Sequence, residues 1–169
     1  MEQTVTSSTT KGIVIGLILV VLALISFLMD MQPNNYLQYV SYIVFIVGII
    51  WSVSIYGKQI DHNSTFGNYF AHGFKVAAII TAIMVIYVII IINVSPDMKE
   101  KAMDAARKKM ESKGNLSSDQ MNQALDITKR FFNVLVIGST LIGYLIFGAI
   151  ASLIGAGVTK KNPHPFVEG

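Results

Sequence analysis

The residues best suited to chemistry lie in and just after the polar segment GKQIDHNS, at positions 57–64. Asp61 and His62 are adjacent there, and His72 and Lys75 follow in the next stretch, which becomes apolar. A lysine at headgroup depth can meet a phosphate as a point charge. One hypothesis is therefore an interfacial polar site, formed by Asp61, His62, His72 and Lys75, that acts on a lipid.

A structural role explains the same residues more simply. A metal site needs two or three converging histidines or carboxylates, but His62 and His72 would face about 80° apart on one continuous helix. We favour polar anchoring of a helix at the membrane interface. No nucleotide-binding loop, lipase elbow or HExxH motif is present. The sequence therefore predicts no catalytic residue, no cofactor and no metal.

Composition places the chain in a membrane. Of its 169 residues 53% are hydrophobic and only 14% are charged, whereas soluble domains carry about 25% charged residues. The net charge of +3 does not indicate nucleic-acid binding, because the Lys and Arg residues flank apolar runs, where topology and anionic lipid explain them. The absence of cysteine excludes disulfides, thiolate metal sites and cysteine catalysis.

Four apolar runs set the expected architecture. They are long enough to cross a hydrocarbon core of about 30 Å as helices, and they predict an all-α, integral membrane four-helix bundle forming one domain over 1–169. The first run is too long for a signal-peptide core and lacks an A-x-A-like cleavage site. A turn is expected at 30–35 (DMQPNN), between the first two spans. The expected spans are 12–29, 37–56, 74–94 and 131–158.

Small residues recur every four positions in or directly beside three of these runs. Such spacing lets membrane helices approach closely. The stripes would serve packing inside the bundle or contact with a partner. They are Gly12 and Gly16; Gly73, Ala77 and Thr81; and Gly148, Ser152 and Ala156.

The polar portion at 96–130 is expected to form a helical hairpin outside the membrane. Ser95 is predicted as an N-cap, and Gly114 as a left-handed helix stop. A second helix should start at Ser117, which forms a capping box with Gln120. Leu116 and Met121 are spaced as a hydrophobic staple.

Phenylalanines at 66, 70 and 74 share one helical face and predict a helix leading into the third span. Together with two glycines they match the pattern Phe-Gly-x-x-Phe-x-x-Gly-Phe, and with the four spans and the insert the chain resembles a bacterial membrane family, common among Bacteroidetes, known as domain of unknown function 4199. The resemblance implies an inner-membrane location and brings no activity. The matching positions are Phe66, Gly67, Phe70, Gly73 and Phe74.

All ten acidic residues fall outside the four apolar runs. Because ionisable residues inside spans usually mark ion paths, we disfavour a transporter or channel. We favour a non-catalytic membrane subunit or scaffold that binds a membrane-protein partner, or a second copy, through its hairpin and small-residue faces. The alternative is a lipid-acting enzyme or lipid carrier with the interfacial site near Asp61, His72 and Lys75.

Charge also predicts orientation, with two signals in conflict. Five lysines lie at the termini and in the second connection, whereas the first turn has no Lys or Arg. The insert carries eight Lys and Arg on the opposite side. Since the first helix usually dominates, we expect both termini in the cytoplasm and the insert outside.

Overall fold

The computed structural model describes residues 5–29, 36–114 and 117–161. Helices account for nearly all of these residues, and no strand occurs among them. This confirms the all-α prediction. The expected turn at 30–35 and Leu116 of the expected staple lie outside the described residues.

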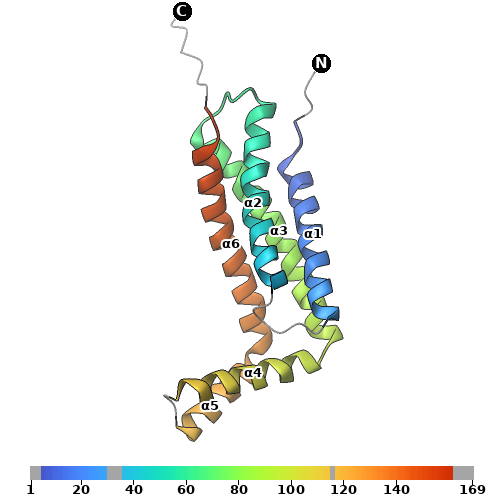
Figure 1. Ribbon diagram of the computed structural model, residues 1–169, viewed down its shortest axis with the longest axis vertical. Helices are drawn as coiled ribbons and strands as arrows, with labels where there is room; N and C mark the ends of the chain where they lie inside the picture. Colours follow the sequence, from blue (N-terminus) through green and yellow to red (C-terminus); the bar gives the residue numbers. More distant parts are fainter. Residues whose placement is uncertain (1–4, 30–35, 115–116, 162–169) are drawn as a thin grey trace, which may run out of the picture. The chain divides into compact units, whose positions relative to one another are not determined.

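Four of the helices are long and apolar enough to cross a membrane, in agreement with the predicted fold class. The amphipathic approach at Phe66 and the third apolar run form one continuous helix, as predicted. Two shorter, polar helices separate it from the last span (Figure 1). The long helices are α1 (Ser8–Leu28), α2 (Tyr36–Gln59), α3 (Phe66–Val94) and α6 (Phe132–Val158), and the short ones are α4 (Asp97–Lys113) and α5 (Ser118–Arg130).

The chain divides into two compact units. Unit 1 comprises Met1–Met84 and Leu141–Gly169, and therefore contains α1, α2, the first part of α3 and the second part of α6. Unit 2 comprises Val85–Thr140. In chain order it contains the end of α3, then α4 and α5, and then the start of α6.

Glycines allow α1 to lie directly against α3 in unit 1. A Cβ atom at Gly12 would stand 2.8 Å from Cβ of Ile79, and one at Gly16 would stand 2.7 Å from Cδ1 of Ile83. Real Cβ atoms essentially never approach so closely. The GxxxG pair of the first span is therefore occupied by a neighbouring helix of the same chain.

Small residues also join α3 to α6. A Cβ at Gly148 would lie 2.5 Å from Cβ of Ala77, and one at Gly73 would lie 2.9 Å from Oγ of Ser152. Because hydroxyls in an apolar interior need partners, Ser152 donates to the carbonyl of its own helix at Gly148, 2.6 Å away. Thr81 and Ala156 are buried as well. These small residues thus form part of the interior of unit 1.

The outer surface of the long helices is apolar. Exposed side chains include Ile18 on α1, Val47 on α2 and Ile150 on α6. Helices that pack closely on one another and are apolar outside suit a hydrocarbon environment.

In unit 2, α4 and α5 contact each other, and local signals define their ends. Gly114 ends α4 with a left-handed φ of 63°. Ser117 begins α5 with the predicted capping box, in which its hydroxyl accepts from the Gln120 amide at 3.3 Å and the Gln120 side chain accepts in return at 3.0 Å.

The start of α4 differs from the prediction. Pro96, and not Ser95, occupies the N-cap position, and no side chain caps the helix. Proline fixes φ near −65°, so Pro96 already has helical angles, with φ −59° and ψ −31°. The Ser95 carbonyl accepts instead from the Met98 amide at 3.1 Å.

Candidate functional site

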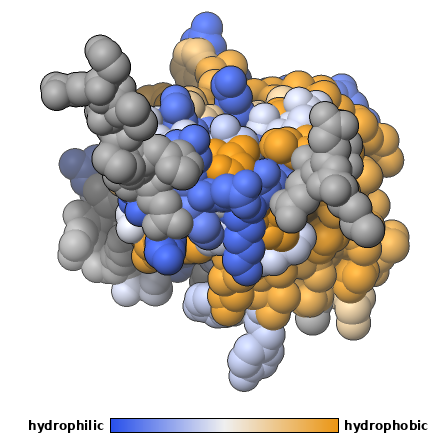
Figure 2. Space-filling model, turned by 90° about the horizontal axis from the view of Figure 1, so that it is seen from above, coloured by the Kyte–Doolittle hydropathy of each residue, from blue (hydrophilic) through white to orange (hydrophobic). Residues whose placement is uncertain are grey.

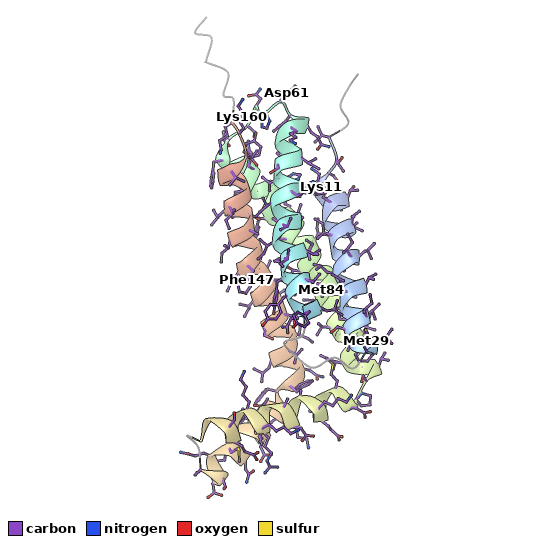
Figure 3. The ribbon with its side chains drawn as sticks, in the orientation of Figure 1. Lys11, Met29, Asp61, Met84, Phe147 and Lys160 are labelled. Carbon is purple, nitrogen blue, oxygen red and sulfur yellow. The ribbon has the colours of Figure 1, made fainter. Side chains whose placement is uncertain are left out.

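The candidate polar residues gather near one end of unit 1, where α1 begins, α2 connects to α3 and α6 ends (Figure 3). The connection starts with a Schellman-type reversal, in which the His62 amide donates to Gly57 O at 2.8 Å and the Asp61 amide to Lys58 O at 3.3 Å. Asp61 and His62 have left-handed φ values of 51° and 60°. Glycine is the usual residue at such positions, because a Cβ there is strained.

The reversed turn contacts the end of α6. His62 Nδ1 lies 2.9 Å from the Lys160 carbonyl, and since a carbonyl only accepts, the proton of this bond must be on Nδ1. A Cβ at Gly57 would stand 2.5 Å from Cγ2 of Thr159. This turn therefore ties together two segments almost a hundred residues apart in the sequence.

Lys11 is the least expected residue of this end, since its side chain is only 6% exposed. Its ammonium group donates to the Ser52 carbonyl and to Oε1 of Gln59, both at 3.3 Å. It also lies 5.9 Å from the centre of the Tyr56 ring. Gln59 is held in turn by Thr6, which donates to Oε1 at 3.2 Å and accepts from Nε2 at 3.0 Å. Among the described residues, the Lys11 ammonium group is thus stabilised by oxygen dipoles and a π face.

His72 is packed inside the bundle next to Lys11. It is 9% exposed, its ring stacks on Tyr56 with 4.1 Å between centroids, and its Nε2 lies 3.5 Å from Oγ of Ser52. Ser52 therefore contacts Lys11 with its backbone and His72 with its side chain. This arrangement couples α1, α2 and α3 through one small buried polar cluster, made of Lys11, Ser52, Tyr56, Gln59 and His72.

Lys161 covers the end of α6. Its ammonium group donates to the carbonyls of Ala156 at 2.8 Å and Thr159 at 3.2 Å, which satisfies acceptors that a helix end leaves free. The same group lies 5.7 Å from the Phe66 ring centre and 5.9 Å from that of Tyr69. The Tyr69 hydroxyl is buried and has no hydrogen-bond partner in the described structure.

The four residues of the predicted interfacial site have different environments. His72 is buried, and the His62 ring bonds to Lys160, whereas Asp61 and Lys75 are exposed. No hydrogen bond or ion pair joins any two of these four side chains within the described residues. That part of the chain also contains no group of three or more His, Cys, Asp or Glu able to hold a metal ion.

The phenylalanine–glycine positions play several structural roles on α3. Phe66 is 44% exposed at the bundle end, and Phe70 stacks on Phe74 with ring centres 5.8 Å apart. Gly73 allows the close approach of Val53 and α6, whereas a Cβ at Gly67 would meet only the Thr65 hydroxyl, at 3.9 Å.

Sequence reasoning missed the buried role of Lys11, which it used only as a topology signal. One signal was available. Lys11 and Ile15 are spaced by four residues, as are Gly12 and Gly16, so the lysine shares the helix face of the glycine pair. All four are buried. Its acceptors on α2, 41 and 48 residues away, leave no local trace in the sequence.

Comparison with known proteins gives a family and no function. No curated protein matches the chain, and no solved structure does. One family model, described as "Protein of unknown function (DUF4199)", matches residues 10–161, which is nearly the whole chain. The match includes α1 to α6 from Thr10 onward and all five phenylalanine–glycine positions. The chain therefore belongs to the family of proteins of unknown function DUF4199.

Proposed function

We propose that this protein is a non-catalytic subunit of a bacterial inner membrane, and that it binds a partner protein through α4 and α5. Those two helices would form a hairpin outside the membrane. The observation that carries the proposal is the contrast between the polar pair α4–α5 and the closely packed, apolar helices of unit 1. The small-residue stripes on α1, α3 and α6 already pack within that unit, which leaves the hairpin as the better partner surface.

The surface of α4 and α5 offers features that a protein partner can use. A groove of about 390 Å³ is lined by residues of α4 and α5, and these residues include charges of both signs. Ile127 on α5 is 60% exposed and Met98 on α4 is 37% exposed. A partner segment with both charged and apolar side chains fits this combination. The charged lining residues are Lys99, Arg107 and Lys129 against Glu100, Asp104 and Asp126.

The lipid-acting alternative has less support. It requires Asp61, His72 and Lys75 to act together on a headgroup, yet His72 is buried against Tyr56 while the other two are exposed. We therefore favour the subunit role over an enzyme, a carrier or a channel.

Site-specific photocrosslinking in membranes tests the subunit role. A benzophenone amino acid at Ile127 should give a discrete adduct with another protein. The matched control at Ile142, an equally exposed isoleucine of the apolar α6 surface, should give none. Adducts at Ile142 alone, or no protein adduct at Ile127 in native membranes, would contradict the hairpin as the partner surface.

A further inference from the structure

Among the described residues, the end of unit 1 that carries the α2–α3 connection has an excess of positive charge. Five lysines lie at or near this end, and Asp61 is the single acidic residue of unit 1 among the described residues. Figure 2 shows hydrophilic residues gathered in the middle of this end and hydrophobic residues along its flank. The lysines are Lys11, Lys58, Lys75, Lys160 and Lys161.

These lysines fall into two groups. Lys11 and Lys161 donate to carbonyl or amide oxygens of the protein, so their charges are internally solvated. Lys58, Lys75 and Lys160 are exposed, and their side chains make no hydrogen bond or ion pair with the described residues. Three ammonium groups are thus available to an external anion.

Two of these lysines adjoin one junction in the chain, and the third lies on α3. Lys58 and Lys160 adjoin Gly57 and Thr159, the residues at which the ends of α2 and α6 meet. Lys75 lies deeper along α3, and its long stem can carry the ammonium group towards the interface.

The surface beside the ends of α2 and α6 has the features of a membrane interface. Phe66 is exposed beside the Lys161 ammonium group, an arrangement suited to the membrane interface. Hydrophobic residues lie along the flank of this end (Figure 2). An anion that meets Lys58, Lys75 and Lys160 is therefore best supplied by the surrounding lipid leaflet.

We propose that this end binds anionic phospholipids, with Lys58, Lys75 and Lys160 contacting their phosphate groups. Basic residues at a membrane surface attract anionic headgroups, and lysine binds phosphate as a point charge. The proposal concerns binding alone and is independent of the partner assigned to α4 and α5.

Native mass spectrometry of the full chain, released from micelles containing phosphatidylglycerol and phosphatidylcholine, measures the preference directly. The wild type should retain phosphatidylglycerol preferentially. In the variant K58Q/K75Q/K160Q, the ratio of retained phosphatidylglycerol to phosphatidylcholine should fall by about fivefold per lysine removed. In K58R/K75R/K160R this ratio should stay as in the wild type.

A matched control removes the same charge from unit 2. The variant K108Q/K109Q/R130Q, also at exposed positions, should retain the wild-type preference. Equal lipid selectivity in wild type and K58Q/K75Q/K160Q, or an equal loss in the unit 2 control, would overturn the proposal. Displacement of the lipid by inorganic phosphate, but not by chloride at the same ionic strength, would assign the lysines to a free anion and would also overturn it.

Discussion

At the scale of single residues, the buried polar cluster around Lys11 fixes the position of α1 along α2. Apolar contacts between these helices would set that position less sharply. Non-directional apolar contacts tolerate small shifts, whereas an ammonium group between Ser52 O and Gln59 Oε1 fixes one register. His72 and Tyr56 extend the same constraint to α3 through their stacked rings. Lys11, Tyr56 and His72 thus position α1, α2 and α3 relative to one another. Their residue types alone did not indicate this role.

Replacing Lys11 by alanine should destabilise the protein by about 1–3 kcal/mol, because two hydrogen bonds from a charged group and the packing of its stem are lost. Reversible unfolding in mixed micelles measures the free energy change. Lys75→Ala is the matched control, since this lysine of the same unit is exposed, and it should change stability by less than about 0.5 kcal/mol. Equal changes in the free energy of unfolding for the two substitutions would show that the buried contacts of Lys11 do not stabilise the protein.

At the scale of elements, the sequence predicts most where the determining contacts are local. The Ser117–Gln120 capping box, the Gly114 stop and the helix beginning at Phe66 were all predictable from residues within a few positions. The cap at Ser95 was predicted wrongly, because Pro96 adopts helical angles itself.

Contacts between segments far apart in the sequence were not predicted. The bond from His62 to Lys160 spans 98 positions, and the acceptors of Lys11 are more than 40 residues away. Such pairs depend on how helices pack, and periodicity within one helix carries no information about the neighbour. The stripes of small residues predicted close approach, but not which helix would approach.

The junction of α3 and α6 gives a matched pair of glycine substitutions. Gly148→Ala should destabilise the protein by about 1–3 kcal/mol through overpacking, because the new Cβ would stand 2.5 Å from that of Ala77. Gly143→Ala on the same helix meets nothing within 4 Å and should be neutral or slightly stabilising, since alanine favours helix. Thermal unfolding in one detergent compares the two, and a reversed order of stability would contradict the α3–α6 packing.

The start of α5 is a second test at the scale of elements. Ser117→Ala removes the hydroxyl that accepts from the Gln120 amide and should cost the helix about 1 kcal/mol. Hydrogen–deuterium exchange should then speed up in the first turn of α5. Ser118→Ala, one position later and inside the helix, should leave exchange unchanged or slower. Identical exchange in both variants would argue against the capping box.

At the scale of the whole molecule, the distribution of charge predicts how the chain sits in the bilayer. Lysines cluster at one end of unit 1, while the described part of α4 and α5 carries both signs, including the ion pair Arg107–Glu111 at 3.4 Å. Basic residues near short loops favour the cytoplasmic side, and acidic residues contribute little to this rule. The eight Lys and Arg of the insert therefore compete with the five of the lysine end.

We expect the first helix to decide this competition, because it inserts first and has Lys11 before it and no Lys or Arg in the following turn. Since the chain has no cysteine, single introduced cysteines report the topology without interference. A membrane-impermeant maleimide should label Lys108→Cys in intact spheroplasts and label Lys160→Cys only after lysis. A green fluorescent reporter fused after Gly169 should be fluorescent, and an alkaline phosphatase fused there should be inactive. The opposite pattern in both assays would reverse the topology, and it would make α4 and α5 a docking element for a cytoplasmic partner.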